Sequence, residues 1–231
     1  MKSDIARMKN LSMTYGNNAV LKDMTIDIPS GEIIGLIGAN GCGKTTMMKI
    51  LAGLIQTYSG EVQILGEKNT WNTKQRVCFY PSNPFYFPSS TIEQAMKTQE
   101  LLFPNYNIEL ARSVYKQFSF DLSAKMGTLS KGRCALAQFI LHLARDAQLY
   151  LLDEPFGGID VKTRKLMKDV LMSYVVPDRT YLISTHEITD METLFDRILL
   201  IKDGSVIIND TTDELRDRYS CSITDIVKEA L

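Results

Sequence analysis

Tryptophan and histidine are scarce in this chain, which has one of the former and two of the latter among its 231 residues. Cysteine is also sparse: the four thiols show neither metal-ligand spacing nor the paired pattern of a small disulfide scaffold. We therefore expect no cysteine metal site and no disulfide framework, and such thiols fit a reducing cytosol.

Long apolar runs and charge of one sign are lacking as well. No window approaches the roughly 20 apolar residues that a membrane-spanning helix needs, and residues 1–30 lack the apolar core of a signal peptide. Lysine plus arginine number 26 against 27 for aspartate plus glutamate, which gives a formal net charge of −1. Without a basic block, no nucleic-acid partner is expected.

A phosphate-binding loop is the most informative feature that is present. Residues 38–45 read Gly-Ala-Asn-Gly-Cys-Gly-Lys-Thr and fill every position of the pattern G-x-x-x-x-G-K-[ST]. An apolar strand-like run at 33–37 precedes the loop, and a helix-like segment at 46–51 follows it. Such loops hold phosphate because glycines permit unusual backbone angles and the helix N-terminus directs free N–H groups at an anion.

The loop predicts a nucleoside triphosphate as its ligand, accompanied by Mg²⁺. Lys44 is expected to contact the β and γ phosphates, and the Thr45 hydroxyl is expected to be a ligand of Mg²⁺. The loop residues predicted to contact the nucleotide are Gly38, Asn40, Gly41, Cys42, Gly43, Lys44, Thr45 and Thr46.

The remaining pattern predicts an α/β fold that forms one domain over residues 1–231, with a mostly parallel core sheet. Short strands over 4–28, broken by a turn signal at 15–18, indicate an N-terminal antiparallel β layer. The dipeptide Asp203-Gly204 indicates a hairpin, and two short helices are expected at about 211–231. Further strands are expected at 61–65, 76–80, 148–152 and 180–184.

A helical subdomain is predicted at about 84–145, where prolines punctuate segments of helical periodicity. Ser90 to Glu93 reads as a capping box that begins its first helix, and a second helix is expected at 107–118. The subdomain ends in an apolar-periodic helix at 132–145, after which the chain returns to the sheet.

Two carboxylates stand at the end of a strand. The segment 148–152 is apolar in the way expected of a parallel strand buried on both faces, and Asp153 and Glu154 follow directly. Because ligands of such sheets gather at the carboxyl ends of the strands, both carboxylates should lie beside the phosphate loop. A helix at about 160–176 and the strand at 180–184 come next, and His186 follows that strand.

The order of these motifs resembles that of the ATP-binding-cassette (ABC) family of ATPases. The resemblance covers about residues 4–210 and implies a P-loop NTPase fold that hydrolyses ATP by in-line attack of water on the γ-phosphate. It rests on the phosphate loop, on Leu-Ser-Lys-Gly-Arg at 129–133, on Tyr-Leu-Leu-Asp-Glu-Pro at 150–155, on Gly-Gly-Ile-Asp at 157–160 and on His186.

The resemblance assigns roles to residues around the loop. Asp153 would hold Mg²⁺ through water, and Glu154 would polarise the attacking water. His186 would donate to a γ-phosphate oxygen, whereas His142 lies in an apolar-periodic helix and is expected to be structural. Tyr15 would stack on adenine, with an ordinary turn tyrosine as the alternative.

The same resemblance implies a dimer. Ser130 and Gly132 lie at a helix N-terminus and would reach across to the nucleotide of a second cassette, so that two chains hold two ATP molecules head to tail. Asp160 would lie along that interface and link the two sites. The second cassette is either an identical or a different ABC chain.

Two places depart from the family pattern. Ser82 stands where the family usually has a glutamine that touches Mg²⁺ and senses the membrane partner, so metal contact would need a bridging water and coupling is expected to be weaker or differently timed. In the signature segment, Lys131 and Arg133 replace the usual glycine and glutamine. This charge would favour a triphosphate across the interface, unless Lys131 points to solvent.

The leading hypothesis is the ATP-hydrolysing subunit of an ABC membrane transporter, peripheral at the cytoplasmic face of the cell membrane and bound to separate transmembrane permease subunits. The signature favours export of a drug, lipid or peptide, with direction and cargo left open. The alternatives are a soluble ABC-type ATPase that acts on a non-membrane complex and a weakly hydrolysing regulatory subunit. A kinase is disfavoured because no acceptor site is recognisable.

Overall fold

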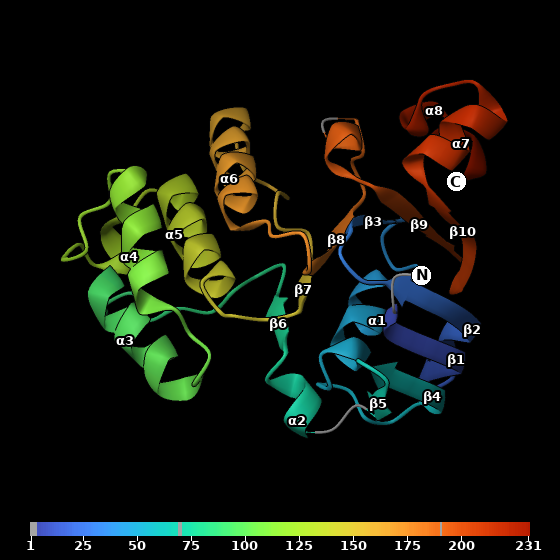
Figure 1. Ribbon diagram of the computed structural model, residues 1–231, viewed down its shortest axis with the longest axis horizontal. Helices are drawn as coiled ribbons and strands as arrows, with labels where there is room; N and C mark the ends of the chain where they lie inside the picture. The colour runs from blue at the N-terminus through green and yellow to red at the C-terminus, as the bar shows by residue number, and fades with distance from the viewer. Residues whose placement is uncertain (1–3, 69–70, 190) are drawn as a thin grey trace.

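The computed structural model describes residues 4–68, 71–189 and 191–231. Its first sheet has the strand order β2-β1-β4-β5 and confirms the predicted N-terminal antiparallel layer (Figure 1). β1 (Asp4–Tyr15) pairs with β2 (Asn18–Pro29) on one side and with β4 (Ser59–Ile64) on the other. The short β5 (Glu67–Lys68) pairs with β4 and completes this sheet.

The second sheet has the strand order β10-β9-β3-β8-β7-β6 and is parallel except for the pairing of β10 with β9. All residues of β3 and β7 are buried, as expected for parallel strands that are covered on both faces. Its strands are β3 (Ile33–Ile37), β6 (Val77–Tyr80), β7 (Leu149–Leu152), β8 (Thr180–Thr185), β9 (Arg197–Lys202) and β10 (Ser205–Thr211).

The two faces of this second sheet pack in two different apolar clusters. Along β7 the residues alternate: Leu149 and Leu151 belong to the cluster that contains α1 (Lys44–Leu51) and the first sheet. Tyr150 and Leu152 point to the opposite cluster, which contains α5 (Lys131–Leu143) and α6 (Val161–Tyr174). This alternation follows from the two-residue period of a strand.

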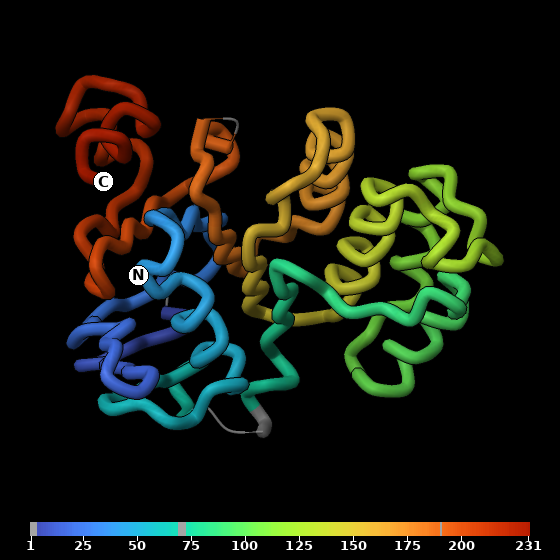
Figure 2. The backbone as a smooth tube through the Cα atoms, turned by 180° about the vertical axis from the view of Figure 1, so that it is seen from behind, coloured from blue at the N-terminus to red at the C-terminus, as the bar shows by residue number. Residues whose placement is uncertain are grey.

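Three helices occupy the segment predicted as the helical subdomain: α3 (Ile92–Leu102), α4 (Ile108–Gln117) and α5. Figures 1 and 2 show them gathered at the opposite end of the molecule from the first sheet. The subdomain boundary at 84–145 itself stays a prediction. The other described helices are α2 (Trp71–Lys74), α7 (Thr212–Tyr219), α8 (Ile223–Ala230) and the short 3-10 turns Met126–Thr128 and Glu192–Leu194.

The prediction of a capping box from Ser90 to Glu93 was wrong by one position. The N-cap is Thr91, whose hydroxyl accepts from the Gln94 backbone N–H at 3.1 Å, while the Gln94 side chain accepts from the Thr91 N–H at 2.9 Å. Glu93 is instead bound to Arg112 on α4 at 2.6 Å. The helix thus begins one residue later than predicted, and Glu93 forms a tertiary ion pair instead of a capping bond.

None of the described helices is both long enough and apolar enough to cross a membrane.

Candidate functional site

The phosphate loop connects the buried strand β3 to α1. Gly43, the N-cap of α1, has φ of 110°, and a Cβ there would lie 2.6 Å from the Leu21 side chain, so both backbone and space require glycine. Among the described residues, no side chain caps α1 and no acidic residue lies in its first turn. Its first N–H groups and the positive end of its dipole are thus directed at any anion bound there.

Lys44 is almost buried, with 6% of its surface exposed. Its Nζ donates to the carbonyl oxygens of Gly38 at 2.6 Å and of Ala39 at 3.1 Å, and lies 3.9 Å from Glu154 Oε1. The ammonium group is therefore held at the mouth of the loop. A cavity of about 150 Å³ opens there, lined by Val20, Asn40, Gly41, Gly43, Lys44, Thr45, Thr46 and Glu154.

Asp153 lies at the carboxyl end of β7, and only 1% of it is exposed. The Thr45 hydroxyl donates to its carboxylate at 2.9 and 3.0 Å, and the Ser184 hydroxyl donates to it at 2.8 Å. Ser184 also accepts from the Glu154 backbone N–H at 2.8 Å. The sequence reasoning missed Ser184, although its position at the end of β8, two residues before His186, was a usable signal.

The oxygen atoms of Thr45 and Asp153 fit a magnesium ion. The described residues contain no group of three or more His, Cys, Asp or Glu side chains that could enclose a metal. The Asp153 carboxylate beside the Thr45 hydroxyl suits Mg²⁺, which proteins usually hold through one or two carboxylates together with substrate phosphates and water. Among the described residues, the Thr45 and Ser184 hydroxyls are the hydrogen-bond partners of this buried carboxylate, so a cation beside it would be stabilised.

Glu154 and His186 face each other. Nδ1 of His186 lies 3.0 Å from both carboxylate oxygens of Glu154, and Nε2 lies 3.9 Å from Glu187 Oε1. The other oxygen of Glu187 is bound to Arg164 on α6 at 3.3 Å. Glu154 has φ of 46°, a left-handed conformation that is uncommon outside glycine and is concentrated at functional sites.

The residues predicted to face a second cassette have contacts within this chain. Ser130 is the N-cap of α5, and Asp160 is the N-cap of α6, where it accepts from the Thr163 hydroxyl and backbone N–H. These hydrogen bonds lower the pKa of Asp160. A Cβ at Gly132 would lie 2.4 Å from Thr163 Oγ1, so glycine lets α5 approach α6 closely.

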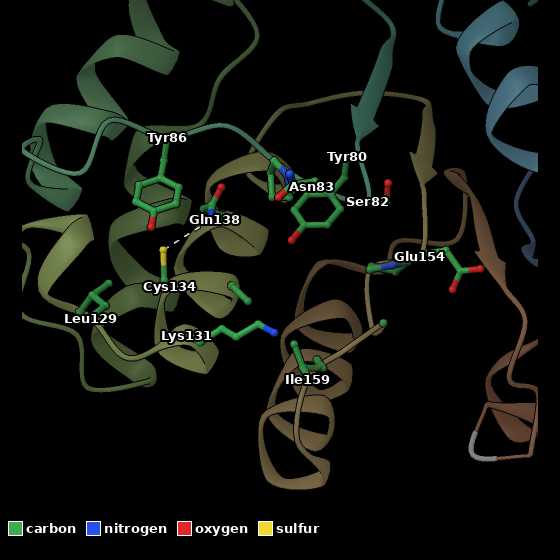
Figure 3. Close-up of a pocket in the computed structure, with 14 residues that line it drawn as sticks. Tyr80, Ser82, Asn83, Tyr86, Leu129, Lys131, Cys134, Gln138, Glu154 and Ile159 are labelled. Atoms are coloured by element: carbon green, nitrogen blue, oxygen red, sulfur yellow. Dashed lines mark hydrogen bonds between the residues drawn. The ribbon is translucent and has the colours of Figure 1, made fainter.

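A larger cavity of about 410 Å³ joins the signature segment to Glu154. Ser82, Asn83, Lys131 and Glu154 all line it, and Lys131 extends into it from the start of α5 (Figure 3). Arg133 has a different environment, because its guanidinium donates to two backbone carbonyls after α4 and lies over the Phe120 ring. Of the two signature cations, only Lys131 lines this cavity.

Tyr15 is the last residue of β1, opposite Asn18 in the β1–β2 register, and it is half exposed. Val20, a few residues further along β2, lines the cavity at the phosphate loop. The half-exposed aromatic ring thus stands on a strand pair that reaches the phosphate loop. Its stacking on adenine stays a prediction.

Comparisons with known proteins agree with one another. The model of the ABC transporter family matches residues 21–157. ABC transporter ATP-binding protein YtrB of Bacillus subtilis is 32% identical over 92% of this chain and 74% of its own. ABC transporter ATP-binding protein MJ1023 of Methanocaldococcus jannaschii is 31% identical over 87% of this chain and 75% of its own.

A solved structure described as the ATP binding subunit of an ABC transporter has the same fold. It superimposes with a TM-score of 0.85 at 24% identity, over 97% of this chain and 98% of that one. The names of further relatives include both import and export systems, so they do not favour one direction.

Proposed function

Since the chain belongs to the ABC transporter family and is an ATPase of that family, we propose that it binds ATP with Mg²⁺ in the phosphate loop and drives a membrane transporter as one of a pair of such chains. The observation that supports this best is the grouping of three side chains: Lys44 and Glu154 line the cavity at the phosphate loop, and His186 lies 3.0 Å from Glu154. Thr45 and Asp153 lie beside them.

In the proposed reaction, Glu154 orients a water molecule for attack on the γ-phosphate, and His186 turns from Glu154 to a phosphate oxygen. Lys44 exchanges its loop carbonyls for β and γ oxygens, a small movement because the ammonium already lies at the loop. Mg²⁺, when bound near Thr45 and Asp153, would neutralise phosphate charge. Positioning and charge stabilisation then supply most of the catalysis.

A second cassette is part of this proposal. The N-terminus of α5, with Ser130 as its cap, borders the 410 Å³ cavity through Leu129 and Lys131, and none of the described residues that line this cavity belongs to the phosphate loop. Its free N–H groups would bind the γ-phosphate held by the other chain. Two ATP molecules would then be enclosed head to tail, either in a homodimer or with a different ABC chain.

Transmembrane permease subunits are the proposed partners, at the cytoplasmic face of the membrane. Phe85 and Phe87 support a protein partner, because they are 79% and 62% exposed and form an edge-to-face pair with ring centroids 5.0 Å apart. Exposed aromatic side chains of this kind are typical anchors of protein interfaces. Export of a drug, lipid or peptide is the proposed direction and cargo, on the strength of the signature sequence.

The experiment is Mg²⁺-dependent ATP hydrolysis by the wild type and by Glu154→Gln. We expect hydrolysis to fall by about 10²–10⁴-fold, the usual contribution of a general base, while ATP binding is retained. Sedimentation should show the variant as an ATP-dependent dimer. Wild-type protein that binds ATP without hydrolysing it would indicate the regulatory subunit instead.

Purification of the tagged chain from its source cells tests the partner. Retention of a multi-spanning membrane protein supports the transporter, and retention of a soluble complex alone would favour the non-membrane ATPase.

A further inference from the structure

The imidazole of His186 lies between two carboxylates, and the proposed reaction uses only one of them. Nδ1 is 3.0 Å from both oxygens of Glu154, whereas Nε2 is 3.9 Å from Oε1 of Glu187. Among the described residues, these two glutamates are the acids next to the ring nitrogens. Each nitrogen of the ring therefore has an acceptor on its own side, and the proposed reaction leaves Glu187 without a part.

Glu187 is held by a cation from a different element. Its Oε2 lies 3.3 Å from Nη1 of Arg164, which lies in the first half of α6 and has a side chain that is 18% exposed. This pairing leaves Oε1 as the oxygen of Glu187 that faces His186. An ion pair with an exposed carboxylate contributes little to stability, so the effect of Arg164 is to direct the Glu187 side chain rather than to hold the fold together.

The backbone around His186 is restrained by Thr185, the last residue of β8. Its hydroxyl donates to the Glu187 carbonyl at 2.9 Å and accepts from the Glu187 backbone N–H at 3.0 Å. These two bonds span the histidine from one side to the other. Any movement of the imidazole between Glu154 and a nucleotide must therefore come mainly from rotation of its own side chain.

A small cavity beside the ring gives room for that rotation. It has a volume of about 40 Å³, and Glu154, Arg164, His186 and Glu187 are among the residues that line it. The separation of 3.9 Å between Nε2 and Oε1 is too long for a direct hydrogen bond, but the cavity can hold a water molecule that bridges the two atoms. Either such a water or a small turn of the ring completes the contact.

We propose that Glu187 is a positioning residue for His186: it binds the ring nitrogen that faces away from the nucleotide, and so aims the other nitrogen at the γ-phosphate when ATP draws the ring from Glu154. The inference rests on the proposed function, because it requires His186 to act on the phosphate. A carboxylate bound to one nitrogen of an imidazole fixes the orientation of the ring and the nitrogen that donates. Without Glu187, the ring released by Glu154 would occupy several orientations.

Steady-state ATP hydrolysis by Glu187→Gln tests this role. We expect kcat to fall about 10–100-fold while KM for ATP stays unchanged, because a misplaced group slows the reaction without removing a nucleotide contact. Glu187→Asp, which keeps the carboxylate, should recover most of kcat. An unchanged kcat, a raised KM with kcat preserved, or an aspartate variant no faster than Glu187→Gln would each overturn the inference.

Glu109→Gln is the matched control, because Glu109 is also an exposed glutamate held by an arginine, at 3.2 Å on α4. Its kcat should equal that of the wild type. Urea unfolding of Glu187→Gln and Glu109→Gln should match the wild type, which separates a positioning role from damage to the fold. A loss of kcat in Glu187→Gln that is matched by Glu109→Gln would count against any specific action on His186.

A His186→Ala background separates this inference from the proposed function. In that background Glu187→Gln should lower kcat no further, because Glu187 acts through the imidazole. The same loss in both backgrounds would overturn the positioning role. If His186→Ala alone hydrolyses ATP as the wild type does, the proposed role of the histidine fails and the inference fails with it. If His186→Ala is slow and Glu187→Gln is not, the inference alone fails.

The ring also gives a readout that does not depend on turnover. The chain has two histidines, so the nitrogen-15 NMR signals lost in His186→Ala assign the ring of His186. With Mg²⁺ and a non-hydrolysable ATP analogue, the wild type should show one set of ring signals, and Glu187→Gln should show broadened or multiple sets. Identical ring signals from the two proteins in the presence of the analogue would overturn the inference.

Discussion

His186 and Glu154 are joined symmetrically, with one ring nitrogen 3.0 Å from each of two carboxylate oxygens. Lys44 lies 3.9 Å from one of those oxygens. The carboxylate proposed to orient water therefore has two cationic or proton-donating neighbours that nucleotide would attract away from it. In the proposed mechanism, binding of ATP would release Glu154, because the γ-phosphate would compete for the same two groups.

His186→Ala should lower kcat by about 10²–10⁴-fold, since the side chain acts on the reacting phosphate, while KM for ATP changes little. The imidazole is on the surface, so the free energy of unfolding should shift by less than about 0.5 kcal/mol. Steady-state ATP hydrolysis and urea unfolding measure the two effects. A raised KM with kcat preserved would show that His186 only binds nucleotide.

Gly132→Ala should destabilise the protein by about 1–3 kcal/mol, the usual cost of overpacking. The added methyl carbon would lie 2.4 Å from Thr163 Oγ1 and force α5 away from α6. Urea unfolding measures the loss, and the double variant with Thr163→Ala should recover part of it. Additive losses in the double variant would contradict this close approach as the cause.

Cys42 should be the thiol whose alkylation inactivates the enzyme. It is half-buried in the phosphate loop, whereas Cys78 and Cys134 are buried and Cys221 is exposed far along the chain. N-ethylmaleimide should inactivate a Cys221→Ser variant, and ATP should slow inactivation in proportion to the occupied fraction of sites. The rate of activity loss with and without ATP checks this, and identical rates would place the reactive thiol outside the nucleotide site.

We expect Glu192 to make the free energy of unfolding depend on pH. Burial opposes its ionisation, but hydrogen bonds from the Thr224 hydroxyl and from the backbone N–H groups of Ile223 and Thr224 outweigh burial and lower its pKa. A carboxylate with a lowered folded-state pKa contributes stability above its ordinary value near 4.5, and loses it as the pH falls through the folded-state value.

Glu192→Gln should therefore cost about 1–3 kcal/mol at pH 7, and the difference from the wild type should shrink toward pH 3. Urea unfolding at both values measures this. Glu109→Gln, at a well-exposed carboxylate, is the control and should show almost no effect. A cost for Glu192→Gln that is the same at both pH values would rule out the ionised carboxylate as its source.

The sequence predicts the core sheet well because its signals are local. Continuous apolar runs mark β3 and β7, because parallel strands are covered on both faces. Asp153 and Glu154 follow β7 directly, so the sequence alone places them at the end of that strand. The hairpin at Asp203-Gly204 was confirmed by β9 and β10. These features depend on residues that are neighbours along the chain.

What the sequence could not provide depends on contacts between distant residues. Glu93, which the local pattern placed in a capping box, is bound to Arg112 on α4, a contact that the local sequence does not indicate. Ser184 becomes a partner of Asp153 only because β8 lies next to β7 in the sheet. Arg145 is a further example. The sequence shows only a charged residue after a helix, whereas the fold buries its side chain.

Glu192 also joins two parts of the molecule that the sequence separates by about thirty positions. It lies six residues after His186 and bonds to the first turn of α8, so the strand end that carries the imidazole is anchored from outside the nucleotide site. An antibody fragment that binds α8 should therefore restrict the segment that carries His186, through the bonds between Glu192 and α8. Such a fragment should change the rate of ATP hydrolysis without contacting the phosphate loop.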